Sequence, residues 1–257
     1  MDVNKIQTAL TGRFKNLKIS FKSEVQSTNL WAKESLAEGL KDPALFITNH
    51  QTSGYGREQR VWESPAGKNI LISLVDNPPQ NPSFVYQLTL VFGVAQALAL
   101  SSQFQKLPFQ LKWPNDLYLN GKKMGGILVE YPSQFQKVII GVGININSSQ
   151  KDFSQDVAKI ATSLFEETKT THILEPLVAS ILNEYTNWRQ IYDTQGLRPI
   201  ISAWNSLSFI TGKKVRVQES PEKSYEGVVL RLDEDGFLIL RVDNQEKQVS
   251  FGDITIQ

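Results

Sequence analysis

Four short runs, rich in branched aliphatic and aromatic side chains, follow one another between residues 109 and 147. Their sequences are FQLKW (109–113), LYL (117–119), GILVEY (126–131) and KVIIGVGININ (137–147). Side chains of these types pack well on a pleated surface, so each run predicts a β-strand. Asn120-Gly121 separates the second run from the third, and this dipeptide is a strong signal for a hairpin turn. We therefore expect a sheet that is built largely from hairpins.

Helical patterns surround these strands along the chain. The segment 28–38 has Ser27 or Thr28 as a possible cap at its start and Gly39 at its end. The most apolar run of the chain predicts a buried helix at 83–101, and apolar periodicity predicts helices at 173–192 and 197–206. Two more strands are expected at 44–49 and 69–75. The mixture predicts an α+β fold, in which a mixed, mostly antiparallel sheet packs against helices.

The pattern of the sequence changes near residue 212 from helical periodicity to short strands. Short alternating runs follow, and Asp235-Gly236 and Asp243-Asn244 provide turns between them. This stretch of roughly 45 residues is too small for much core of its own, so we expect it to dock on the larger part. We place the boundary between a main domain, 1–208, and a small all-β domain, 209–257.

Composition excludes several classes of function. The chain has 257 residues and no cysteine, which excludes disulfides, thiolate catalysis and cysteine-bound zinc. Lys and Arg number 27 and Asp and Glu 26, so a general nucleic-acid footprint is not expected. The N-terminus lacks the apolar region of a secretion signal, and the apolar run 88–100 is too short to span a bilayer. A cytoplasmic location with no membrane partner is the default expectation.

The loop QTSGYGREQRVWESPAGKN (51–69) combines three glycines with Arg57, Arg60 and Lys68. A solvated surface loop is the usual explanation for such a cluster. The alternative is an anion cradle, because glycines let backbone N–H groups approach a ligand and arginines supply planar donors. The residues alone leave both interpretations open.

Two further segments combine polar residues with apparently buried strands. Lys112 and Asp116 flank a Trp-Pro-Asn kink, and Lys123 follows the hairpin turn. These residues either decorate a hairpin or meet a bound anion or metal, since a buried charge needs a partner. Asn145 and Asn147 share one side of a strand by its two-residue period, so both could face a ligand. Ser27-Thr28-Asn29, taken alone, is a helix cap.

Taken together and in this order, the segments closely resemble biotin protein ligases. The matching motifs are STN at 27–29, the loop at 51–69, KWPND at 112–116, KKMGGILVE at 122–130 and GVGIN at 141–145. The tail resembles the SH3-like β-barrel at the C-terminus of that family. The resemblance implies a catalytic domain of the type shared with class II aminoacyl-tRNA synthetases. It also implies that biotin and ATP react to biotinyl-5′-AMP, and that biotin then passes to a lysine of a biotin carboxyl carrier protein domain.

The resemblance also implies roles for individual residues. The catalytic residues are Lys123, Arg57, Asp116 and Lys112. Those that bind biotin are Ser27, Thr28, Asn29, Gln51, Gly54, Tyr55, Gly56, Arg57, Lys123 and Gly126. Those on the ATP and adenylate side are Arg57, Arg60, Trp62, Asn115, Asp116, Lys123, Asn145 and Asn147. Mg²⁺ is expected to accompany ATP, with Asp116 as a candidate ligand.

The chain departs from the family's commoner loop pattern, GRGRxGRxW, at two positions. Tyr55 replaces the first arginine and Gln59 replaces the third glycine. We expect the segment 54–60 to be mobile without ligand and to close over biotinyl-AMP. Only 26 residues precede the STN motif, too few for the winged helix-turn-helix of some members. We therefore expect a short form that does not bind DNA and is either a monomer or a homodimer.

Three rival functions remain at this stage. A lipoate–protein ligase uses the same adenylation chemistry on a related fold. A non-catalytic biotin or nucleotide sensor would bind without turnover. A nucleic-acid-binding module would rely on the tail, where KKVRVQ (213–218) is only a weak basic strand.

Overall fold

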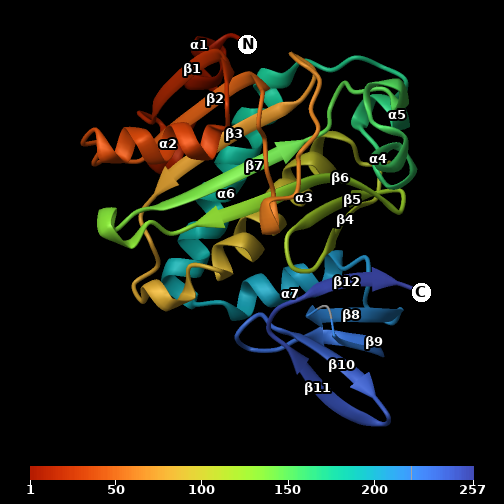
Figure 1. Cartoon of the computed structure of the whole chain (residues 1–257). Helices are drawn as coiled ribbons and strands as arrows, with labels where there is room; N and C mark the ends of the chain where they lie inside the picture. Colours follow the sequence, from red (N-terminus) through yellow and green to blue (C-terminus); the bar gives the residue numbers. More distant parts are fainter. Residues whose placement is uncertain (221) are drawn as a thin grey trace.

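A seven-stranded sheet forms the centre of the larger part of the molecule (Figure 1). The computed structural model describes residues 1–220 and 222–257. The strands are β1 (Lys18–Val25), β2 (Ala44–Gln51), β3 (Ile70–Asp76), β4 (Phe109–Lys112), β5 (Asp116–Leu119), β6 (Lys122–Glu130) and β7 (Val138–Ile144). Their order is β1-β2-β3-β7-β6-β5-β4, in which only β1 and β2 run parallel. The expected mixed, mostly antiparallel sheet is confirmed.

Local sequence signals explain much of this arrangement. Asn120 and Gly121 both have positive φ, the conformation of the tight hairpin turn that joins β5 to β6. The Ser27 side chain accepts a hydrogen bond from the backbone N–H of Leu30 and so caps the next helix. The helices are α1 (Val3–Ala9), α2 (Thr28–Ala37), α3 (Gln87–Gln103), α4 (Gln155–Ile160), α5 (Leu164–Thr168), α6 (Leu174–Gln195) and α7 (Arg198–Leu207). All four predicted helices are therefore confirmed.

The two faces of the sheet have different neighbours. Alternate residues of a strand point to opposite faces, so Ile70, Ile72 and Leu74 of β3 share one of them. That face packs on α3 and α6 in the main core, and both helices lie behind the sheet in Figure 1. On the other face, α2 packs over Val75 and Ile139 in a smaller cluster. The rest of this second face is left free for a cavity.

The C-terminal part is a five-stranded antiparallel sheet that lies below the main sheet in Figure 1. Its strands are β8 (Lys214–Ser220), β9 (Lys223–Leu232), β10 (Leu238–Val242), β11 (Gln245–Val249) and β12 (Asp253–Ile256). They pair in the order β11-β10-β9-β8-β12. Within the described residues β11 and β12 are not paired with each other. The expected small all-β domain is confirmed, and its five strands form a sheet whose outer strands, β11 and β12, pair with β10 and β8.

The small sheet docks on the main domain, as its size predicts. The indole N–H of Trp113 donates to the carbonyl oxygen of Gly236 at 3.1 Å. The side chains of Tyr86 and Gln87 both donate to the carbonyl oxygen of Asp235. None of the helices in the described part of the chain is long and apolar enough to cross a membrane.

Candidate active site

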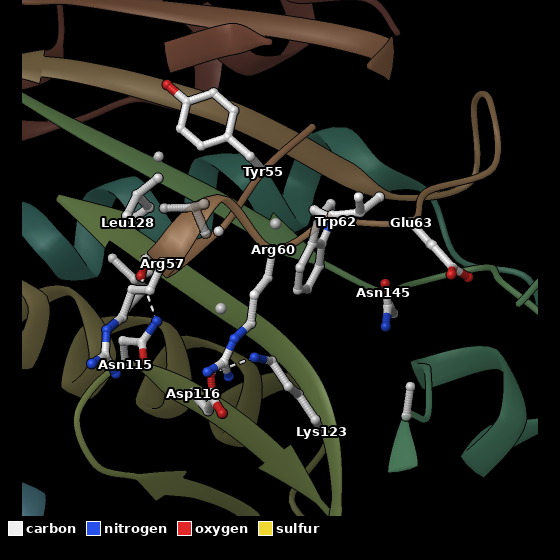
Figure 2. A pocket seen from close by; sticks show the side chains of 18 of the residues that line it. Tyr55, Arg57, Arg60, Trp62, Glu63, Asn115, Asp116, Lys123, Leu128 and Asn145 are labelled. Carbon is white, nitrogen blue, oxygen red and sulfur yellow. Dashed lines mark hydrogen bonds and ion pairs between the residues drawn. The ribbon is translucent and has the colours of Figure 1, made fainter. Parts of the chain in front are cut away.

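A cavity of about 410 Å³ lies on the face of the main sheet that α2 leaves uncovered. The loop 51–69 forms one side of it, strands β5, β6 and β7 form its floor, and β12 of the small sheet closes another side. Figure 2 shows Lys123 and Asp116 on the strands, facing the loop that carries Arg57, Arg60 and Trp62. Residues from most of the sequence motifs therefore meet in one place.

Three glycines in the floor of the cavity let neighbouring side chains lie directly on the sheet. Gly126 of β6 pairs in register with Gly143 of β7, and Gly141 lies on the same face two residues away. A Cβ atom at Gly143 would lie 2.6 Å from the ring of Trp62, and one at Gly141 would overlap the amide of Asn29. These positions need glycine because the side chains of Trp62 and Asn29 occupy the space above them.

One end of the cavity is neutral and rich in hydrogen-bonding groups. The Gln51 Oε1 atom accepts from the backbone N–H of Thr28 at 2.7 Å and from its hydroxyl at 3.0 Å. Ser73 Oγ lies 2.7 Å from Thr28 Oγ1 and 2.5 Å from Asn29 Oδ1. Ser27, Thr28 and Asn29 are all buried, so this end is held by the fold. Such fixed, neutral donors and acceptors suit an uncharged polar ligand group.

The other end of the cavity is charged. The Lys123 ammonium forms an ion pair with Asp116 Oδ1 at 2.6 Å and lies 5.8 Å from the centre of the Trp62 ring. Burial lowers the pKa of Lys112, and the neighbouring Asp116 carboxylate partly opposes that shift. Two lysines therefore share one aspartate, which leaves positive charge available for an anion.

The arginine loop contacts the small sheet. The Arg57 Nη2 atom donates to the carbonyl oxygen of Gly252 at 3.3 Å, and the Arg60 guanidinium pairs with Asp253. Asp253, Ile254 and Thr255 of β12 also line the cavity. The side chain of Glu63 accepts from the backbone N–H and the hydroxyl of Ser154, just before α4. The loop is thus held at two separate places, the start of β12 and the residue before α4.

Two asparagines at the cavity are already engaged with backbone groups. The Asn115 side chain donates to the carbonyl oxygen of Ile127 at 2.8 Å, and the Asn145 side chain donates to that of Thr162 at 3.2 Å. The indole Nε1 of Trp62 is buried and has no hydrogen-bond partner within the described residues. This buried N–H lies against Gly143 in the floor of the cavity, and the Trp62 side chain also lines the cavity.

The structure brings together all but two of the predicted site residues. Those that line the cavity are Ser27, Thr28, Asn29, Gln51, Tyr55, Gly56, Arg57, Arg60, Trp62, Lys112, Asn115, Asp116, Lys123, Gly126 and Asn145. Gly54 lies beneath Gln51, where a Cβ atom would approach the Gln51 amide to 2.8 Å. Asn147 lies outside the cavity and exchanges hydrogen bonds with the backbone of His172.

The position of Asn147 has a simple cause. The expected strand through residue 147 is wrong, because β7 ends at Ile144 and the two-residue period ends with it. Sequence reasoning also missed Glu63, Glu130 and Asp253. Glu130 lies in KKMGGILVE without a recognised role, and Asp253 lies 193 residues from its partner Arg60, so only the tertiary fold reveals their contacts with the loop.

The residues present do not form a metal site by themselves. Across 1–220 and 222–257, no three His, Asp or Glu side chains gather closely enough to hold a metal ion. Asp116, the predicted ligand, is paired with Lys123. A magnesium ion here would have to take most of its ligands from a bound phosphate chain.

Known proteins with similar sequence and fold identify the family. Residues 20–145 match the Biotin/lipoate A/B protein ligase family, and residues 210–256 match the Biotin protein ligase C terminal domain. The Bifunctional ligase/repressor BirA of Bacillus spizizenii is 31% identical over 92% of this chain and 73% of its own length. The Biotin--[acetyl-CoA-carboxylase] ligase of Paracoccus denitrificans is 30% identical over 85% of this chain and 92% of its own.

A solved structure of a biotin protein ligase has the same fold. The biotin protein ligase from Aquifex aeolicus, solved in complex with biotin and ATP, has a TM-score of 0.81. It is 24% identical to this chain, and the match covers 93% of this chain and 98% of that one. Sequence, fold and the gathered motifs thus agree, and this chain belongs to the biotin protein ligase family.

Proposed function

We propose that this chain activates biotin with ATP as biotinyl-5′-AMP and then transfers biotin to a lysine of a biotin carboxyl carrier protein domain. We further propose that both steps take place in the cavity on the glycine-lined face of the main sheet. One observation carries this proposal. The same cavity joins the neutral end around Gln51 and Thr28 to the charged end around Lys123 and the arginine loop.

The neutral end is suited to the ureido head group of biotin. That group is planar and uncharged, and it has two N–H donors and one carbonyl acceptor. Ser27, Thr28 and Gln51 offer both donors and acceptors there, and their existing hydrogen bonds hold them in place. Gly126 has no side chain and lines the cavity, so it leaves the backbone of β6 accessible to the rest of the ligand.

The charged end is suited to the first reaction step. A carboxylate oxygen of biotin attacks the α-phosphorus of ATP, and pyrophosphate leaves with its electron pair. Two unit charges at about 4 Å repel by about 4 kcal/mol near a protein surface, so the site must offset this repulsion. Lys123 and Lys112 supply positive charge, while Asp116 holds the Lys123 ammonium in position. Trp62 lines the cavity and offers its aromatic ring to the adenosine part.

The loop is suited to the second step. The acceptor lysine attacks the carbonyl carbon of the mixed anhydride, and AMP leaves. Water would hydrolyse the same anhydride, so it must be excluded until the carrier arrives. Arg57 and Arg60 can lie over the phosphate of the adenylate, and glycines on both sides of Tyr55 give the loop freedom to move. We propose that the chain consists of a main domain, 1–208, and a small domain, 209–257. In that division β12 belongs to the small domain, and it supports this loop.

Magnesium would enter this site with ATP. It would screen the phosphate charges, and Asp116 is the acidic residue of β5 that faces the cavity. We propose no DNA-binding role, since the net charge of +1 gives no general attraction to a polyanion. Both a monomer and a homodimer are compatible with a cavity made from one chain.

An assay with purified protein tests this function. The protein is incubated with ATP, magnesium, radiolabelled biotin and an apo carrier domain, and label on the carrier lysine is measured. We expect labelling that requires ATP and the intact acceptor lysine. Efficient labelling with lipoate in place of biotin would favour the lipoate ligase, and tight biotin binding without pyrophosphate release would favour a sensor. Either result would contradict the proposal.

A further inference from the structure

Tyr55 occupies the loop position at which the family's commoner pattern has an arginine. Its ring points away from the Lys123 end of the cavity (Figure 2). The hydroxyl donates to the carboxylate of Glu130, 3.2 Å from Oε2 and 3.5 Å from Oε1. Glu130 is the last residue of β6, so this contact joins the loop to the central sheet.

Glu130 is itself held in place by buried groups. The Asn29 side-chain amide donates to Glu130 Oε2 at 2.6 Å, and Asn29 Oδ1 lies 2.5 Å from Ser73 Oγ on β3. Asn29 and Ser73 are both buried. A continuous chain of hydrogen bonds therefore runs from the middle of the sheet, past the start of α2, to the Tyr55 hydroxyl. A partner that is positioned in this way makes a firm anchor.

Tyr55 lies at the base of the part of the loop that carries Arg57 and Arg60. Tyr55 and Val61 form an isolated β-bridge, and the backbone N–H of Trp62 donates to the carbonyl oxygen of Gly54 at 2.9 Å. These contacts close residues 54–62 into a compact flap that carries Arg57 and Arg60. Fastening Tyr55 therefore fastens the base of the whole flap.

We propose that the Tyr55 hydroxyl and the Glu130 carboxylate form a latch that keeps the flap closed and so retains biotinyl-AMP in the cavity. In this role Tyr55 is a positioning residue, because it acts through the placement of Arg57 and Arg60. The inference rests on the proposed function in so far as it names the retained compound. The latch itself is a contact between the loop and the sheet.

The chemical state of the pair suits a latch. Burial raises the pKa of the Tyr55 hydroxyl, and the charge of Glu130 and the hydrogen bond to it raise that pKa further. The phenol therefore stays protonated at neutral pH and donates. Loss of one hydrogen bond of this kind changes an equilibrium roughly 3- to 10-fold.

The test compares Tyr55→Phe with the wild-type protein in two assays. The first measures the rate of tryptic cleavage after Arg57 and Arg60 without ligand. The second measures dissociation of preformed biotinyl-AMP by chasing with unlabelled biotin and ATP. We expect both rates to rise roughly 3- to 10-fold.

Tyr225→Phe is the matched control. The Tyr225 hydroxyl also donates to a carboxylate, that of Glu219 at 2.8 Å, but it lies on the small sheet outside the cavity. This variant loses the same chemical group and should leave both rates unchanged. If it raises them as much as Tyr55→Phe does, the latch is overturned.

Two further variants connect the effect to Glu130. Tyr55→Arg should have rates nearer to those of the wild type than Tyr55→Phe has, because the arginine guanidinium can pair with the Glu130 carboxylate. Adding Glu130→Gln to Tyr55→Phe should raise the two rates no further than the larger single effect. Additive effects, or wild-type rates in Tyr55→Phe, would overturn the latch.

The two assays also separate this inference from the proposed function. If the wild-type protein forms no biotinyl-AMP, the function is wrong, while the cleavage assay still decides whether Tyr55 holds the flap. If the wild type forms the adenylate and Tyr55→Phe leaves cleavage and release unchanged, only the latch is wrong.

Discussion

Asp76 and Asp116 belong to the same sheet but differ in their burial and in how many partners their carboxylates have. Asp76 is fully buried at the end of β3, on the face that packs against α6. Its carboxylate accepts from Tyr185 at 2.9 Å and from Arg189 at 3.1 Å, and it also pairs with Arg13. Asp116 lies on the opposite, glycine-lined face and has a single ion pair, with Lys123. One aspartate is fully partnered and the other is not.

The two aspartates also lie at opposite ends of the sheet. Asp116 is in register with Gly126, then Gly143, then Leu71 on β3. Asp76 is five residues beyond Leu71, which corresponds to roughly 17 Å along the strand. The fully partnered cluster joins β3, α6 and the N-terminal segment, so it stabilises the fold. The cluster around Asp116 keeps positive charge available and faces a cavity, so it can act on a ligand.

Asp76→Ala should have the largest effect of the variants considered, and the property it changes is the stability of the fold. The substitution leaves the buried Arg189 without its buried carboxylate partner, which costs about 3–5 kcal/mol in the free energy of unfolding. Chemical denaturation measures that loss. Asp193→Ala is the control, because it removes the more exposed partner of the same arginine and should cost less than about 1 kcal/mol. Equal losses in the two variants would mean that Asp76 is not the centre of the cluster.

Lys123→Ala should have the converse effect, a large loss of activity with little change in stability. Removal of this ammonium should lower biotin-dependent ATP–pyrophosphate exchange by at least about 100-fold, since it helps two anions to meet. The free energy of unfolding should change by less than about 1 kcal/mol. Lys122→Ala, on the same strand but exposed and outside the cavity, should retain the exchange rate. Undiminished exchange in Lys123→Ala would break the comparison.

Arg57→Gly should separate adenylate synthesis from adenylate retention. The loop loses a guanidinium that faces the cavity, so biotinyl-AMP should escape roughly 10-fold faster while its synthesis continues. Escaped adenylate acylates exposed lysines without selection. Mass spectrometry of a mixture of the carrier domain and an unrelated protein would then find biotin on both. Label that stays on the single carrier lysine would contradict this role.

Lys112→Met should have the smallest effect and should sharpen the comparison most. Burial disfavours the Lys112 ammonium, as its lowered pKa indicates, so an apolar side chain of similar length should stabilise the fold by about 1 kcal/mol. The same change should lower pyrophosphate exchange by about 10-fold. The exposed Lys106→Met is the control for both measurements. A loss of stability in Lys112→Met would mean that the Lys112 ammonium stabilises the fold, as the charges around Asp76 do.

The sequence predicts the parts of the fold that depend on neighbours along the chain. The Asn120-Gly121 turn and the apolar residues of α3 and α6 are local signals, and they were sufficient to predict the hairpin and the two helices. Strand β1 was missed because most of its side chains are exposed and it is held by parallel pairing with β2, a non-local contact. Strand β12 was missed because its four residues depend on pairing with β8.

The site divides in the same way. Lys123, Asp116 and Arg57 were found because they lie in recognisable motifs, and the fold brings those motifs to one cavity. The partners of the loop, Glu130 and Asp253, belong to elements that meet it only after folding. A motif identifies a group that can react. Which element holds that group in position is decided by the tertiary fold.

The most direct test of the central claim is a crystal structure of the protein grown with biotin and ATP. The account predicts difference density for biotinyl-AMP in the glycine-lined cavity. The head group should lie at Thr28 and Gln51, and the phosphate should lie between Lys123 and Arg57. An adenylate bound elsewhere on the molecule, with Lys123 and Arg57 both away from it, would contradict the account.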